Sequence, residues 1–200
     1  MATTRTATGG AALRQKVTDA IKDAVFTELA ETGYAGLSME AVARRAGVGK
    51  AALYRRWASK QEMLTELLRQ AVEDTLPPVP DTGALHSDLR QYFGTMRGQL
   101  AHPVVSTIGT GLIAESRRSD AFGEALRRDV AAPRRAAARA MLRTAIERGE
   151  LSERLDMELA ADLLIAPLGF RVLVMDEDSG EEYLDVLTTT IEAALKAAVR

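Results

Sequence analysis

Apolar residues recur along the chain every three or four positions, which is the spacing of one face of an α-helix. Five residues form the first such stripe: Leu13, Val17, Ile21, Val25 and Leu29. The stripe stops at Gly33, and glycine suits the left-handed backbone position that often follows a helix. Alternating runs of β-branched residues, the usual sign of strands, are scarce. The pattern therefore predicts an all-α protein.

Two short helices joined by a tight corner are predicted next. Ser38 can cap the first of them. Four residues of that helix face inward: Met39, Val42, Ala43 and Ala46. The corner is Gly47-Val48-Gly49, because glycine tolerates the positive φ that such a turn needs. A helix over residues 50–57 follows, so residues 38–57 predict a helix-turn-helix whose second helix enters the major groove of DNA.

Prolines mark the predicted domain boundary. Ser59 and Glu62 fit a capping box for a helix that stops before Pro77-Pro78-Val79-Pro80, where fixed φ and missing amide donors prevent helix continuation. The prediction is a DNA-binding domain over residues 13–76, a linker over 77–83 and a larger helical domain over 84–200. Residues 1–12 are small and polar and are expected to form a disordered tail.

Five helices are expected after the linker, at residues 84–101, 104–117, 120–148, 156–175 and 181–198. Asp156 can cap the fourth, and Ser179 with Glu182 fits a capping box for the fifth.

Positive charge is concentrated in the predicted helix-turn-helix. Residues 41–60 contain six Lys or Arg and no Asp or Glu, whereas the whole chain has 26 basic and 28 acidic residues and a net charge of −2. Such a run is often only a solvated face. Here, however, four residues of the second helix fall within an arc of about 140°: Lys50, Ala51, Tyr54 and Arg55. Leu53 and Trp57 stack toward the other helices, and Arg56 is expected to point to solvent. The window is therefore interpreted as a DNA-binding surface.

A longer set of residues extends this interpretation. Its members, in order, are Gly33-Tyr34, Leu37-Ser38-Met39, Val42-Ala43, Ala46-Gly47-Val48, Leu53-Tyr54, Trp57 and Ser59-Lys60. Residues 14–73, which contain them, resemble the DNA-binding domain of the TetR/AcrR family of transcriptional repressors. Trp57 stands where that family usually has Phe, and Arg56 where it often has His.

The resemblance implies roles for the residues of the second helix and its neighbours. Tyr54 and Lys60 would contact backbone phosphates, and Lys50, Ala51 and Arg55 would face base edges. Lys60 lies at a helix N-terminus, where a cation opposes the macrodipole, and this also favours a phosphate partner over a structural role.

The first helix of the motif is expected to cross the DNA backbone. The resemblance implies that Ser38 would cap this helix against a phosphate. Arg44 and Arg45 lie on the same helix, and one of them is alternatively only solvated.

The stretch RGELSERLDMELAADLLIAPLGFRVLV resembles the C-terminal half of one TetR subfamily, whose last two helices pair with a second subunit as a four-helix bundle. Two apolar stripes fit a homodimer interface of that kind: Leu159, Leu163, Ala166 and Phe170, then Leu184, Leu187, Ile191 and Leu195. The alternative is that both stripes complete the core of a single subunit.

In this family a small-molecule effector binds among the helices after the linker. The apolar candidates for that pocket are Tyr92, Phe93, Met96, Leu100, Ile108, Leu112, Phe122, Met141 and Phe170. Methionines and aromatic residues at helical spacing commonly fill a core instead, so each residue is also a candidate core residue. None of these residues is charged, and the expected effector is largely apolar.

Other functions find little support in the sequence. There is no cysteine, and His86 and His102 are far apart on one predicted helix, so neither a metal site nor a base–nucleophile pair is indicated. Gly109-Thr110-Gly111 lacks the remainder of a phosphate loop, and no cofactor or catalytic site is predicted. No apolar stretch is long enough to span a bilayer, and a cytoplasmic protein is expected. An architectural DNA-binding protein without an effector is the remaining alternative.

Overall fold

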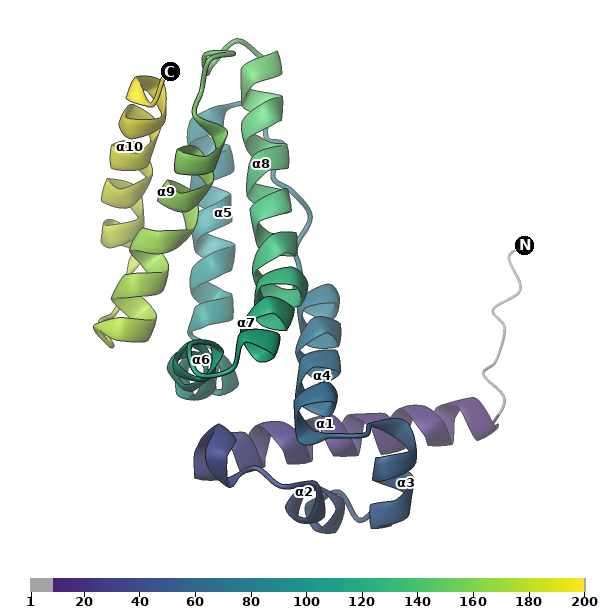
Figure 1. Cartoon of the computed structure of the whole chain (residues 1–200). Coiled ribbons are helices and arrows are strands. Elements are labelled where there is room, and N and C mark those ends of the chain that lie inside the picture. The colour runs from purple at the N-terminus through teal and green to yellow at the C-terminus, as the bar shows by residue number, and fades with distance from the viewer. Residues whose placement is uncertain (1–8, 200) are drawn as a thin grey trace, which may run out of the picture. The chain divides into compact units, whose positions relative to one another are not determined.

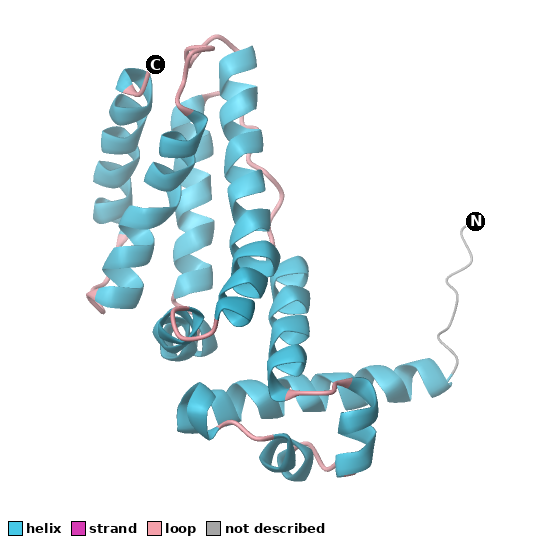
Figure 2. Cartoon of the chain, in the orientation of Figure 1, coloured by secondary structure: helices cyan, strands magenta, loops and turns pink. Residues whose placement is uncertain are grey.

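The structure is a computed structural model that describes the backbone of residues 9–199, and their side chains except those of residues 9–12, 14, 103 and 104. Every regular element in this range is a helix (Figure 2), and the only β-type pairing within it is an isolated bridge between Leu155 and Val199. The all-α prediction is confirmed. The chain divides into two compact units, one ending at Leu68 and the other beginning at Arg69.

The N-terminal unit consists of α1 (Gly9–Gly36), α2 (Met39–Arg45), α3 (Lys50–Arg56) and the first half of α4 (Lys60–Thr75), as Figure 1 shows. Gly33 interrupts α1 with φ 67°, at the predicted helix end. The predicted tail is wrong for residues 9–12, which are helical, and residues 1–8 lie outside the described residues. Ile21, Val25 and Leu29 are buried as expected, but Leu13 and Val17 are exposed. The first turns of α1 therefore extend beyond the core.

The corner between α2 and α3 has the predicted chemistry. Ser38 is the N-cap of α2, and its Oγ accepts a hydrogen bond from the Ala41 amide at 3.2 Å. Gly47 takes φ 66°, which a residue with a side chain adopts only with strain, whereas Gly49 has an ordinary negative φ. Of the two glycines, Gly47 is thus the one that the turn requires.

The C-terminal unit contains the second half of α4 followed by α5 (Leu85–Leu100), α6 (Pro103–Ser116), α7 (Asp120–Leu126), α8 (Ala132–Glu147), α9 (Met157–Gly169) and α10 (Glu181–Ala197). Figure 1 shows α5, α8, α9 and α10 side by side, with α6 across one end. Their facing side chains, among them Phe93, Met141, Leu164 and Leu184, form one apolar core.

Two of the predicted helices contain a turn of π-helix. Residues Arg127–Ala131 join α7 to α8, and Phe170–Val174 extend α9. The helices predicted over residues 120–148 and 156–175 are therefore continuous, but each contains one π-helical turn. Pro133, which has no amide hydrogen to donate, follows the first π turn by two residues. Asp156 caps α9 as predicted, accepting hydrogen bonds from the amides of Glu158 and Leu159.

The predicted capping box of the last helix is wrong. Gly180 is the N-cap of α10 and makes no side-chain cap bond. Ser179 is instead buried, and its carbonyl accepts a hydrogen bond from Arg97 at 3.2 Å. Arg97 also binds the carboxylate of Glu181 in the first turn of α10. An arginine on α5 thus holds the start of α10 in place of a capping hydroxyl.

The boundary between the compact units also differs from the predicted one. The prediction placed it at the prolines after residue 76, but the last turns of α4 group with the C-terminal unit. In that unit, Gln99 on α5 donates a hydrogen bond to the carbonyl of Thr75 at 2.7 Å. One continuous helix therefore belongs to both units, which a search for helix-breaking residues does not detect.

The segment between α4 and α5 is fastened by a buried carboxylate. Asp88 is fully buried and accepts hydrogen bonds from the amide of Thr82 at 2.6 Å and from Arg148 at 2.6 Å. Burial alone would raise the pKa of Asp88, but the hydrogen bonds from Thr82 and Arg148 outweigh it and lower the pKa. Arg148 also pairs with Asp81 and Glu150, so the end of α8 holds this connection from two sides.

Candidate functional site

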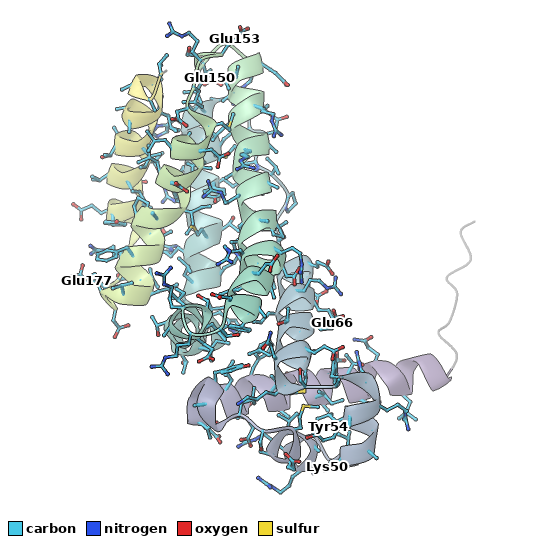
Figure 3. All side chains as sticks on the ribbon, viewed as in Figure 1. Lys50, Tyr54, Glu66, Glu150, Glu153 and Glu177 are labelled. Atoms are coloured by element: carbon cyan, nitrogen blue, oxygen red, sulfur yellow. The ribbon has the colours of Figure 1, made fainter. Side chains whose placement is uncertain are left out.

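The helix α3 has one buried face and one exposed face. Leu53 and Trp57 are 1% and 3% exposed and fix the helix to the core of the N-terminal unit. Four neighbouring residues are exposed on the same helix: Lys50, Ala51, Tyr54 and Arg55. Figure 3 shows Lys50 and Tyr54 at the same solvent-facing edge of this unit. These four are the residues predicted to face DNA, and Ala52 and Arg56 of the same helix are exposed as well. Contact of the four with DNA stays a prediction.

Glu40, a residue that the sequence argument did not identify, connects α2 to this face. Its carboxylate pairs with the ammonium of Lys50 and accepts a hydrogen bond from the Tyr54 hydroxyl at 3.4 Å. The Lys50 ammonium also lies 5.6 Å from the centre of the Tyr54 ring. The hydrogen bond from Lys50 lowers the pKa of Glu40, and the same bond raises the pKa of Lys50. Glu40 lies immediately before the acid-free window 41–60, so a charge count over that window does not include it.

The two arginines of α2 have different environments. Arg45 bonds Glu28 on α1 at 2.8 Å and also pairs with Glu31, so it fastens α2 to α1. Arg44 is exposed and has no hydrogen bond or ion pair in the described part of the chain, and the same holds for Arg55 on α3. Of the two predicted backbone-binding arginines, Arg44 is therefore the one available to a phosphate.

Lys60 has a structural role that the sequence argument rejected. Its ammonium donates to the carbonyls of Tyr34 at 2.9 Å, Leu37 at 3.1 Å and Ala35 at 3.4 Å, and it lies 4.6 Å from the centre of the Tyr34 ring. An ammonium has three donors, and these carbonyls take all of them. Lys60 thus binds carbonyl groups at the C-terminal end of α1, where the helix dipole favours a cation. These contacts offset the unfavourable position of Lys60 at the N-terminus of α4.

Arg56 is exposed, as expected, but its guanidinium also contacts the protein. One of its nitrogens donates to the Thr18 hydroxyl on α1 at 2.9 Å, and its guanidinium stacks 4.3 Å from the centre of the Trp57 ring. The six cations of the basic window therefore separate by contact. Arg45, Arg56 and Lys60 bind residues of α1 or of the segment that follows it. Lys50 pairs with Glu40 on α2, and Arg44 and Arg55 are exposed without a hydrogen bond or ion pair in the described part of the chain.

The two stripes predicted for a dimer interface also differ from each other. All four α10 residues, Leu184, Leu187, Ile191 and Leu195, are buried in the core of their own unit, which is the alternative that the sequence left open for this stripe. On α9, Leu159 and Phe170 are 48% and 58% exposed, Ala166 is exposed and Leu163 is partly buried. Val174 and Met175, which follow Phe170 in the same helical segment, are also exposed. The unpartnered apolar surface thus follows α9.

The residues predicted for an effector pocket lie mostly inside the C-terminal unit. Phe93, Ile108, Leu112, Phe122 and Met141 are buried, and Tyr92, Met96 and Leu100 are partly buried. Phe170 is exposed, which contradicts its place in an enclosed pocket. Residues of a packed core and residues of a pocket wall are both buried, so burial does not distinguish the two roles.

No helix of the described chain is long and apolar enough to cross a membrane.

Two family models match the chain over most of its length. Residues 21–67 match bacterial regulatory proteins of the tetR family, and residues 79–191 match the tetracyclin repressor-like C-terminal domain. The chain therefore belongs to the TetR family of transcriptional regulators, which are DNA-binding proteins and not enzymes.

Individual relatives agree with this assignment. The HTH-type transcriptional regulator YdeS of Bacillus subtilis is 32% identical over 168 residues, 82% of each protein. The DNA-binding transcriptional repressor TetR of Mycobacteroides abscessus is 32% identical over 72% of this chain and 75% of its own length. The solved structure of the TetR family regulator SCO0332 is 31% identical, with a TM-score of 0.68 over 89% of this chain and 97% of that one.

Proposed function

We propose that the chain is a repressor that binds a palindromic operator as a homodimer and is released by a small, largely apolar molecule. The exposed face of α3 is the observation that supports DNA recognition. Lys50, Ala51, Tyr54 and Arg55 lie on this face, and Leu53 and Trp57 anchor the opposite face in the core. One such helix covers only a few base pairs, so two copies on adjacent major grooves are needed for a specific site.

The exposed apolar surface of α9 supports the homodimer. Leu159, Phe170 and Val174 are large side chains that monomeric proteins rarely expose together. A second copy of the same surface would remove them from water and would place a recognition helix on each half of a palindrome.

The continuity of α4 supports a release mechanism. Its first turns belong to the DNA-binding unit and its last turns to the C-terminal unit, where Gln99 binds Thr75. A compound held among α5–α8 that favours one position of α4 would change the separation of the two recognition helices. Such a compound must bind the DNA-free state more tightly, and by reciprocity the operator must weaken the binding of the compound.

The test is a thermal-shift screen of apolar small molecules, followed by operator binding with each compound that stabilises the protein. We expect at least one such compound to weaken operator binding tenfold or more, which corresponds to about 1.4 kcal/mol of coupling. Stabilising compounds that all leave operator affinity unchanged would contradict the release step. They would favour an effector-independent DNA-binding protein whose C-terminal unit serves for dimerisation.

A further inference from the structure

Glu40 and Lys50 form a close pair of opposite charges at the start of α3. Lys50 is the first residue of α3, and Glu40 lies in the first turn of α2. The Lys50 ammonium and the Tyr54 hydroxyl both contact Oε1 of Glu40. The side chains of Lys50 and Glu40 are nevertheless 59% and 49% exposed, so a molecule that binds the outer face of α3 reaches both charges.

Both members of the pair can bind a further group. The ammonium of Lys50 has three donors, and an ionised carboxylate only accepts hydrogen bonds, at about four lone-pair sites. Lys50 lowers the pKa of Glu40, which keeps the carboxylate ionised at neutral pH. The pair therefore offers a strong donor and a strong acceptor side by side.

The position of Lys50 in the motif directs this pair toward the bases. In a helix-turn-helix, the N-terminal residues of the second helix contact base edges in the major groove. A lysine there binds O6 and N7 of guanine, and a carboxylate accepts a hydrogen bond from the N4 amine of cytosine. Guanine O6 and cytosine N4 are neighbours within one G·C base pair, so the two side chains match the two bases of a single pair.

An A·T base pair complements these charges less well. Adenine presents one acceptor, N7, beside its N6 amine, and thymine presents one acceptor, O4, beside its methyl group. The ammonium of Lys50 would find one acceptor there, where guanine provides two. A C·G pair in the opposite orientation would place the carboxylate of Glu40 against the acceptors of guanine.

Glu40 adds a cost that only the matching base pair offsets. When Lys50 turns toward a base, Glu40 loses its cation and is left beside the phosphate backbone, which repels it. The cytosine amine replaces the lost partner on a G·C pair, whereas other pairs leave the carboxylate without a donor. A group that lowers affinity for the wrong sequences in this way increases specificity.

We propose that Glu40 and Lys50 together read one G·C base pair in each half of the operator. The ammonium of Lys50 donates to guanine, and the carboxylate of Glu40 accepts from the amine of the paired cytosine. Glu40 is then a specificity-determining residue, although its charge opposes binding to DNA in general. The proposal rests on the proposed function, because it names the base pair that the same face of α3 recognises.

The first experiment selects binding sites from random double-stranded DNA with the full-length protein and its variants. One position of each half-site should be G·C for the parent protein and should lose that preference in both Glu40→Ala and Lys50→Ala. Glu182→Ala, which removes an exposed acid from the first turn of α10, should return the parental sequence. No position relaxed by both variants, or a shared position that is not G·C, would overturn the proposal.

The second experiment distinguishes base reading by Glu40 from mere positioning of Lys50. Operator DNA carries N4-methylcytosine at the shared position, which replaces an amine hydrogen by a methyl group. We expect this change to weaken binding of the parent protein about tenfold and to leave binding of Glu40→Ala unchanged. Equal sensitivity of both proteins would mean that Glu40 only holds Lys50 in place, and it would overturn the proposal.

A guanine analogue tests the other half of the pair. Operator DNA with 7-deazaguanine at the shared position lacks the N7 acceptor, and it should weaken binding of the parent protein and of Glu40→Ala alike. Binding of Lys50→Ala should be unchanged. A loss that is equally large in Lys50→Ala would overturn the assignment of guanine to Lys50.

The selection also separates this inference from the proposed function. A palindrome that the parent protein enriches, without the shared G·C position, supports the operator and contradicts the role of Glu40. Enrichment of no palindrome contradicts both.

Discussion

The carboxylate of Glu40 on α2 pairs with the ammonium of Lys50 on α3 and accepts a hydrogen bond from Tyr54. Two residues predicted to contact DNA are thus held by an acid of the same protein. In the DNA complex a base edge would compete with Glu40 for Lys50, and the negative charge of Glu40 would itself oppose the phosphate backbone.

Replacing Glu40 should therefore strengthen DNA binding. We expect Glu40→Gln to bind operator and random DNA several-fold more tightly, with the larger gain at low salt, because the change removes a negative charge that repels the phosphate backbone. Fluorescence anisotropy over a salt series measures this effect. Glu182→Gln, which makes the same charge change at an exposed position on α10, is the control and should leave affinity unchanged. Equal or weaker binding by Glu40→Gln would mean that Glu40 positions Lys50 instead of competing for it.

Lys60 is expected to contribute to stability. Lys60→Met should lower the free energy of unfolding by about 1–3 kcal/mol, because the carbonyls of Tyr34, Ala35 and Leu37 lose a charged donor. Chemical denaturation measures the change. Arg55→Ala, which removes an exposed cation that has no partner among the described residues, should leave stability unaltered. If Lys60→Met is as stable as the parent protein, the structural role of Lys60 is contradicted and the predicted phosphate contact is favoured.

Glu40 and Lys60 show which contacts the sequence alone does not predict. The helices, the corner at Gly47 and the cap at Ser38 depend on residues within a few positions of one another, and the sequence predicts all three. The partners of Lys60 lie 23 to 26 positions away, and periodicity carries no information about such contacts.

The faces of the last two helices illustrate the same limit at the level of packing. Leu184 and Leu187 form an apolar stripe, and a stripe indicates burial without indicating which chain provides the cover. The structure covers it with α5 and α9 of the same chain.

The buried carboxylate of Asp88 predicts a pH-dependent stability. Asp88→Asn should lower the free energy of unfolding by about 1–3 kcal/mol at neutral pH, because charge-assisted hydrogen bonds to Thr82 and Arg148 are weakened. The pKa of Asp88 is lowered in the folded protein, so its contribution is present above the unfolded pKa of about 3.9 and is lost as the pH falls through the folded value. Melting curves of both proteins at several pH values test this, and the two should converge in acid. A constant difference down to the most acidic pH would contradict the assignment.

The exposed surface of α9 predicts how the dimer can be broken. Phe170→Glu should yield monomers in light scattering while retaining a cooperative melting transition, because the side chain is exposed in a single subunit and would be buried only between subunits. Leu187→Glu should instead unfold the protein, since Leu187 lies in the core. A Phe170→Glu variant that remains dimeric would place the interface on another surface.

The central claim, that the outer face of α3 reads a palindromic operator, is tested most directly by selection of binding sites from random double-stranded DNA at about 0.15 M salt. The full-length protein should enrich a palindrome whose half-site centres lie about 34–36 Å apart or modestly further. Arg55→Ala should enrich a sequence with relaxed preference at particular base pairs, a loss of about 1–3 kcal/mol at each. Arg154→Ala, an exposed arginine of the C-terminal unit, should return the parental sequence. Enrichment of no palindrome by the parent protein, or an identical consensus from Arg55→Ala, would contradict the assignment of this face.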